Sequence, residues 1–225
     1  SELGKYLSNE SAENAIPVFP VAQSDLKEWL SGLTPGQSRW VKDNGFAAEQ
    51  NEIVKIPGPS GELAAVAIGL GQDEDSFNSP WVFSPLAKAL PDGHYHIVGN
   101  HDPFLAALGW ALAQYGFDHY QDKKNTRCAK LVIKDKAHLK EVNILLNGIA
   151  LVRDLINTPT CDMGPSHLSA VMQQLATEFN ADFSETVGDD LLTSGYRTIH
   201  AVGRGAVNGA RLLDLTWGRK GAPKV

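Results

Sequence analysis

The stretch HYHIVGNHDPFLAALGWALAQYGF, residues 94–117, decides the fold class, because a strand pattern leads directly into a helix pattern. In residues 94–99 histidine alternates with Tyr95 and Ile97, which predicts a strand. Residues 102–117 are mostly apolar and predict a helix, with Asp102 as its N-cap and Pro103 in its first turn. A strand followed by a capped helix is the repeating unit of an α/β fold.

Strand and helix patterns also alternate on the N-terminal side of this stretch. A strand is predicted over residues 15–22, with Ser24 as the N-cap of the helix that follows, and a short helix over 34–45. The segments 51–57 and 62–70 predict a β-hairpin, and the second of them is apolar on both faces, as expected of an interior strand. The other elements predicted before residue 136 are a short helix over 84–91 and a strand over 129–133.

The C-terminal side begins with the longest helical pattern, from Ala137 to Ile156. Its apolar residues recur at intervals of three and four, which is typical of a helix with one apolar face. They are Leu139, Val142, Leu145, Leu146, Ile149, Val152 and Ile156. The elements predicted after it are a helix over 166–179, a strand over 182–187, a short helix over 189–194, and strands over 198–203 and 211–217. We therefore expect a complete α/β domain over residues 1–136, a linking helix over 137–157 and the beginning of a second α/β domain over 158–225.

Composition excludes several classes of protein. The chain has 225 residues and a formal net charge of −6, and no basic run is longer than Lys123-Lys124, which argues against a nucleic-acid or anionic-membrane surface. No apolar run approaches the roughly 20 residues of a membrane span, and no secretory signal pattern is present. Two distant cysteines, Cys128 and Cys161, suit a reducing compartment. We expect a cytoplasmic protein with no nucleic-acid and no membrane partner.

The histidines of residues 94–102 suggest one candidate metal site. His94 and His96 lie two apart on the predicted strand, hence on one face, and His101 and Asp102 follow its end. Such a set has the ligand types of zinc or iron sites. The alternative is a strand with two histidines on its polar face and an aspartate that caps a helix. This alternative is favoured, because the pattern lacks a properly spaced third ligand.

Two glycine-rich loops and one cysteine are further candidates. Gly203, Gly205 and Gly209 resemble a dinucleotide loop, but a strand follows them where a helix is required, so a hairpin connection is favoured. Gly69 and Gly71 follow a buried strand, where a turn is favoured over a ligand loop. Cys161 is a candidate thiol nucleophile with His167 nearby in sequence, but a buried structural cysteine is the default interpretation. Ser60 is a further candidate nucleophile, for which no base partner is identified.

Several motifs after residue 152 together resemble the leucyl aminopeptidase family of two-metal peptidases. They are RDLINTPTCDMGPSHL (153–168), IHAVGRGAVNGARLLDLTWG (199–218) and APKV (222–225), in the order and spacing of that family. The resemblance implies a macro-domain-like three-layer α/β sandwich as the N-terminal domain, followed by the first part of a metallopeptidase domain. It further implies an aminopeptidase that acts on peptides as a hexamer with two divalent metal ions, zinc or manganese.

Two departures from the family pattern limit what this chain is expected to do. Thr160-Cys161 stands where family members more often have Ala-Asn. The segments that supply the family's metal ligands and its catalytic lysine and arginine follow the strand that begins at APKV, and Lys224 lies several residues before the ligand lysine. We therefore expect an inactive N-terminal portion with no catalytic and no metal-binding residue, and we assign no substrate-binding residue. The alternative is a macro-like module that binds ADP-ribose or another nucleotide at loops such as Gly69–Gly71.

Overall fold

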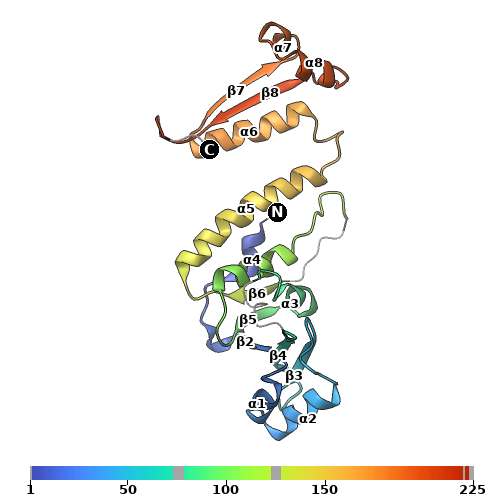
Figure 1. Ribbon diagram of the computed structural model, residues 1–225, viewed down its shortest axis with the longest axis vertical. Coiled ribbons are helices and arrows are strands. Elements are labelled where there is room, and N and C mark those ends of the chain that lie inside the picture. The colour runs from blue at the N-terminus through green and yellow to red at the C-terminus, as the bar shows by residue number, and fades with distance from the viewer. Residues whose placement is uncertain (1, 73–78, 123–127, 220, 223–225) are drawn as a thin grey trace. The chain divides into compact units, whose positions relative to one another are not determined.

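The computed structural model describes residues 2–72, 79–122, 128–219 and 221–222. They belong to two compact units, Ser1–Val152 and Arg153–Val225. Each unit has a sheet of its own (Figure 1). The helix α5 (Lys136–Asn157) begins in the first unit and ends in the second.

The first unit is built on a six-stranded, mostly parallel sheet with the strand order β1-β6-β5-β2-β4-β3. Its strands are β1 (Leu7–Ser8), β2 (Ile16–Val21), β3 (Ile53–Pro57), β4 (Leu63–Gly69), β5 (Gly93–Ile97) and β6 (Ala129–Val132). Strand β2 pairs in parallel with β4 on one side and with β5 on the other. Strands β3 and β4 are antiparallel, which confirms the predicted hairpin.

Strand β4 shows why helices must cover both faces of this sheet. Val66 and Ile68 face one apolar core, and Ala65 and Ala67 face the other. Successive side chains of a strand point to opposite faces, so an uninterrupted apolar run needs a partner layer on each side. The interior position predicted for this strand is confirmed.

The larger core lies between the sheet and the helices α3 (Ser84–Ala89), α4 (Pro103–Ala113) and α5. Val142, Leu146 and Ala150 of α5 are at most 1% exposed, so this helix completes the core of the first unit. The 3-10 helix η1 (Leu3–Tyr6) contributes Leu3 and Tyr6 to the same core.

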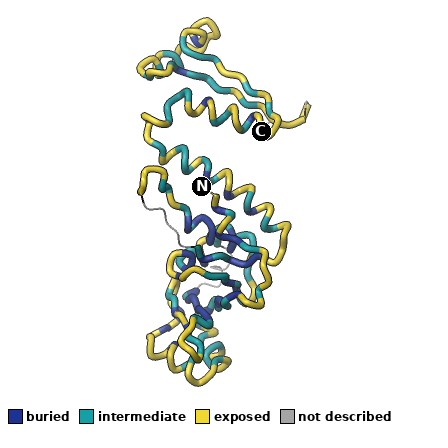
Figure 2. The backbone as a smooth tube through the Cα atoms, turned by 180° about the vertical axis from the view of Figure 1, so that it is seen from behind, coloured by how far each residue is buried: buried dark blue, intermediate teal, exposed yellow. Residues whose placement is uncertain are grey.

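The smaller core joins the other face to α1 (Leu26–Ser31) and α2 (Pro35–Asp43). Val41 of α2 is fully buried, and the ring of Trp29 lies 6.1 Å from that of Phe19 and 5.9 Å from that of Phe46. A sheet between two helical layers is an α/β sandwich, as predicted, and its buried segments gather along the sheet (Figure 2).

The sequence signals for helix starts and ends located some helix boundaries correctly and others not. Thr34 caps α2, where its Oγ1 accepts a hydrogen bond from the Gln37 amide at 3.3 Å. The prediction of Ser24 as an N-cap is wrong: Asp25 occupies the cap position of α1, and the Ser24 hydroxyl donates to the Asp25 carboxylate instead. Helix α4 ends at Ala113, four residues before the predicted end. The elements that the patterns did not predict are η1, β1 and the 3-10 helix η2 (Ala12–Asn14).

The second unit contains α6 (Pro165–Phe179), the antiparallel strands β7 (Asp182–Val187) and β8 (Arg211–Thr216), α7 (Asp190–Thr193) and α8 (Arg197–Gly203). Strands β7 and β8 pair from Asp182↔Thr216 to Val187↔Arg211. Helix α6 packs against both strands. Its C-terminus is closed by Asn180 in the left-handed conformation at φ 51°, a common helix stop.

The strand predicted over residues 198–203 is wrong, because this segment is helix α8. Its β-branched residues favour a strand, but Thr198, Ile199 and Val202 also have the spacing of one helix face. All three line a cavity of about 550 Å³ that Leu168 of α6 also lines. At the end of the helix, a Cβ on Gly203 would lie 2.5 Å from that of Ala210, so only glycine allows this approach.

A histidine-lined cavity at the ends of two strands

A cavity of about 540 Å³ lies at the carboxyl ends of the parallel strands β5 and β6. One wall is the turn from β5 to α4, and the other is the turn from β6 to α5. Its polar lining consists of His96, Asn100, His101, Lys134, Asp135 and His138. Two βα turns that meet at one edge of a parallel sheet are the usual location of ligands in α/β folds.

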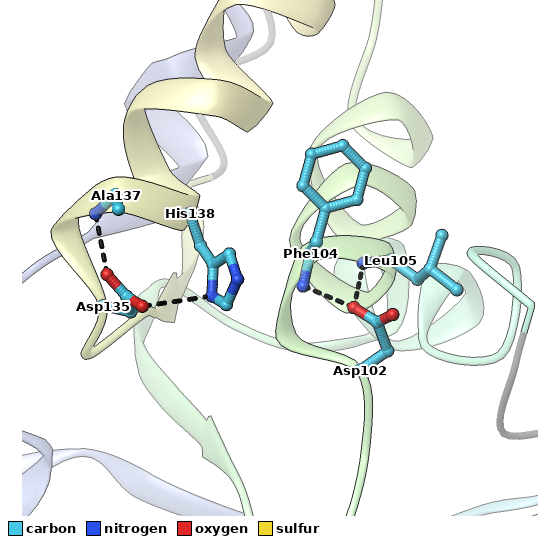
Figure 3. A network of polar contacts seen from close by, with 6 residues as sticks. All are labelled: Asp102, Phe104, Leu105, Asp135, Ala137 and His138. Atoms are coloured by element: carbon cyan, nitrogen blue, oxygen red, sulfur yellow. Dashed lines mark hydrogen bonds and ion pairs between the residues drawn. The ribbon is translucent and has the colours of Figure 1, made fainter.

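Aspartates cap both helices that begin beside this cavity (Figure 3). The Oδ1 of Asp102 accepts hydrogen bonds from the amides of Phe104 at 2.8 Å and Leu105 at 3.1 Å, which confirms the predicted cap of α4. The Oδ1 of Asp135 accepts from the Ala137 amide at 2.7 Å, and its Oδ2 lies 3.5 Å from Nδ1 of His138. Both carboxylates thus satisfy amides at a helix start, where the dipole favours negative charge.

The candidate metal set of His94, His96, His101 and Asp102 is divided between separate partners. His94 pairs with Glu10, Nε2 to Oε2 at 3.3 Å, while Nδ1 of His96 contacts the Ala15 carbonyl oxygen at 3.2 Å. Nδ1 of His101 contacts the Gly99 carbonyl oxygen at 3.0 Å. Among the residues that the structure describes, no group of three or more His, Cys, Asp or Glu side chains is arranged to hold a metal ion.

The Gly69–Gly71 loop is a turn, as favoured from the sequence. The Gly69 amide donates to the Glu52 carbonyl at 2.8 Å and the Gly71 amide donates to the Ala48 carbonyl at 3.0 Å. A Cβ on Gly69 would meet the Glu49 carbonyl oxygen, so glycine serves close backbone packing here. Backbone amides that are already bonded within the turn do not form a phosphate cradle.

The other glycine loop connects a helix to a strand. Gly203 ends α8, and Gly209, at φ 71°, precedes β8. The predicted hairpin connection is therefore wrong, because no strand enters the loop from the N-terminal side. The requirement of a dinucleotide loop is not met either, since a strand rather than a helix follows it.

The default of a buried structural cysteine is wrong for Cys161, which is exposed. Its proposed partner is engaged elsewhere, because Nδ1 of His167 accepts a hydrogen bond from the Gly164 amide at 3.0 Å at the start of α6. Ser60 lies exposed in the hairpin turn, and its amide donates to the Glu62 carboxylate at 3.0 Å. Lys123, Lys124 and Lys224 lie outside the described residues.

Sequence patterns missed a polar cluster in the second unit. The Oε2 of Glu185 accepts hydrogen bonds from the Ser169 hydroxyl at 2.5 Å and from Nη1 of Arg211 at 2.8 Å. The Ser169 hydroxyl and, after it, the Arg211 guanidinium hold the pKa of the Glu185 carboxyl below its usual value. The strand patterns of β7 and β8 could have shown that the two strands pair, with Glu185 opposite Leu213. They could not have shown that Glu185 contacts Ser169 of α6.

Comparison with known families and proteins accounts for nearly the whole chain. Residues 16–134 match the family model described as "M17 aminopeptidase, N-terminal domain". Residues 150–225 match the model described as "Cytosol aminopeptidase family, catalytic domain". A probable cytosol aminopeptidase of Corynebacterium diphtheriae is 27% identical over 99% of this chain and 48% of its own length. The chain thus spans about half the length of this relative.

Solved structures have the same fold. The crystal structure of a cytosol aminopeptidase from Coxiella burnetii superposes with a TM-score of 0.86 and 36% identity, covering 95% of this chain and 46% of that one. The bottromycin maturation enzyme BotP in complex with Mn superposes with a TM-score of 0.71 and 19% identity, covering 91% of this chain and 45% of BotP. At this identity the similarity shows a shared fold only. None of the helices in the described ranges is long and apolar enough to cross a bilayer.

Proposed function

This chain belongs to the M17 aminopeptidase family, as its motifs after residue 152 predict, and on that premise we propose that it is the N-terminal, non-catalytic portion of a metal-dependent leucyl aminopeptidase. The whole enzyme removes amino-terminal residues from peptides in the cytoplasm. The observation that supports this most strongly is the TM-score of 0.86 at 36% identity with the Coxiella burnetii cytosol aminopeptidase over 95% of this chain. The Corynebacterium diphtheriae relative and the Coxiella burnetii structure are named as cytosol aminopeptidases, so they lend no support to the alternative of an ADP-ribose-binding module.

The two family matches, to residues 16–134 and 150–225, support a proposal for the domain organisation of the enzyme. We propose residues 1–136 as the N-terminal domain, residues 137–157 as a linking helix and residues 158–225 as the beginning of the peptidase domain. Two divalent ions, zinc or manganese, would activate water and polarise the scissile carbonyl in the whole enzyme. The described side chains of this chain do not fit such a metal pair, and we assign neither a metal ligand nor a catalytic residue to it. The proposed assembly of the whole enzyme is a homohexamer.

Peptidase assays test this assignment directly. The 225-residue chain is expected to hydrolyse neither leucine amide nor leucine p-nitroanilide, with or without manganese or zinc. A protein of the relatives' length that contains this chain is expected to hydrolyse both substrates when either metal is supplied. Metal-stimulated turnover that copurifies with the 225-residue chain, and survives controls for contaminating peptidases, would contradict the non-catalytic role. An inactive long protein would contradict the aminopeptidase assignment.

A further inference from the structure

Three imidazoles from three separate elements line the cavity at the ends of β5 and β6. His96 comes from β5, His101 from the turn before α4, and His138 from the first turn of α5. Figure 3 shows the His138 ring extending from α5 toward the first turn of α4. The volume of about 540 Å³ is that of a small-molecule site, and no residue of the cavity belongs to the matched peptidase segment.

In each of the three rings Nδ1 has a protein partner, which leaves Nε2 to contact a ligand. Nδ1 of His96 and Nδ1 of His101 contact backbone carbonyl oxygens, which only accept hydrogen bonds, so in each ring Nδ1 carries the proton. Nδ1 of His138 lies beside the Asp135 carboxylate. The remaining ring nitrogen, Nε2, is an acceptor in neutral imidazole and becomes a second donor on protonation.

The charge of the lining depends on these imidazoles. Lys134 contributes an exposed ammonium group, and Asp135 contributes the one carboxylate among the described lining residues. Both Asp135 oxygens are already engaged, by the Ala137 amide and by His138. The lining is therefore close to neutral when the three imidazoles are neutral and becomes cationic as they take up protons. The helix starts add little attraction, because Asp102 and Asp135 already occupy them.

We propose that this cavity is a binding site for a small oxyanion, a phosphate or a carboxylate, held by Nε2 of His96, His101 and His138 and by the Lys134 ammonium. Charge-assisted hydrogen bonds from imidazolium and ammonium donors to an oxyanion are short and strong, and three rings from three elements line this one cavity. The site is separate from the peptidase activity proposed above.

Titration calorimetry on the 225-residue chain tests the proposal, with inorganic phosphate and succinate as separate probes. At least one probe is expected to bind with saturation at pH 6, through charge-assisted hydrogen bonds to the ring nitrogens and the Lys134 ammonium. The probe that binds identifies the oxyanion as phosphate or carboxylate. Absence of saturable binding by either probe at pH 6 overturns the proposal.

A matched pair of variants locates the binding. The double variant His101→Gln/His138→Gln is expected to lose at least about tenfold in affinity, the scale of lost charge-assisted bonds. The control His94→Gln, on the same strand as His96 but paired with Glu10 outside the lining, is expected to bind like the original chain. Equal loss in the control, or full binding by the double variant, overturns the site. Should the double variant fail to fold, ligand-induced shifts of the imidazole nitrogen resonances of His101 and His138, without one at His94, decide the same question.

Discussion

The indole Nε1 of Trp110 donates a hydrogen bond to the Ala129 carbonyl oxygen at 2.9 Å, and this bond ties α4 to β6 across the larger core. Nε2 of Gln114, the residue directly after the end of α4, donates to the same oxygen at 2.9 Å. Trp110 is completely buried and its ring lies 5.9 Å from that of Tyr95. A large apolar side chain with its one polar atom satisfied is thus at the centre of the first unit.

Trp110→Phe is expected to lower the free energy of unfolding by about 2 kcal/mol, because it leaves a cavity and removes one buried hydrogen bond. The control is Trp40→Phe, since Trp40 is 45% exposed although its Nε1 also donates to a carbonyl, that of Lys55, at 2.9 Å. The control is expected to cost less than about 1 kcal/mol. Urea unfolding followed by circular dichroism measures both, and equal losses would contradict the assigned role of burial.

Two helical glycines are expected to respond to alanine in opposite directions. A Cβ on Gly109 of α4 would lie 1.4 Å from the Pro80 carbonyl oxygen, so the backbone must move and the free energy of unfolding falls by about 3 kcal/mol or more. Gly148 of α5 has open space around it, so alanine there raises stability by about 0.5–1 kcal/mol. Thermal melting of both variants checks the signs, and a neutral Gly109→Ala would show that the close approach to Pro80 is not maintained in solution.

The first unit is expected to fold alone only when the start of α5 is included. A chain of residues 1–152 keeps Val142, Leu146 and Ala150 in the core, whereas a chain ending at residue 134, where the N-terminal family match ends, loses all three. Their burial contributes about 4 kcal/mol or more, a large part of the stability of a typical domain. The longer chain should unfold cooperatively in urea and the shorter one should not. Equal cooperativity would contradict the placement of α5 in this core.

Acid is expected to weaken the second unit through Glu185. Because the folded-state pKa of this carboxyl is lowered, chiefly by the Ser169 hydroxyl, the ionised form stabilises the fold above the unfolded-state pKa, and the stabilisation is lost as the pH falls through the folded-state value. Glu185→Gln should therefore speed amide exchange in β7 and β8 at pH 6, and the difference from the original chain should shrink toward pH 3. The effect is expected to stay below about 1 kcal/mol, since the pair with Arg211 is partly exposed and screened by solvent. A difference that is unchanged at low pH would assign it to packing rather than charge.

Of the two predicted N-caps, Asp102 is confirmed at α4, whereas Asp25 and not Ser24 occupies the cap position of α1. The Asp102 cap joins atoms two or three residues apart, so the residue types alone carry the signal. The prediction for the α8 segment was wrong because its seven residues, three of which are β-branched, fit both the strand period and the helix period. Only their packing in the second unit decides for the helix. The two-residue strand β1 has no local signal at all, since its pairing with β6 joins residues more than one hundred positions apart.

The residues of the candidate site could be predicted only in part, because contacts between residues far apart in sequence leave no local pattern. His96, His101 and Asp102 stand out in the sequence, and the cap role of Asp102 follows from its position before Pro103. That His138 lines the same cavity depends on β6 lying beside β5 in the sheet, a pairing that strand patterns do not specify. The Glu185 cluster likewise needs α6 to lie against β7 and β8.

The residue pattern alone determined the order of most helices and strands, the α/β class and, through the motifs after residue 152, membership of the aminopeptidase family. Tertiary structure decided which apolar residues became core. The stripe of α5 is continuous in sequence, yet Val142 and Leu146 are fully buried while Val152 and Ile156 are 54% and 76% exposed. The physical reason is that helical periodicity arises from dihedral geometry within the chain, whereas burial requires a second element against the same face, and residues distant in sequence supply it.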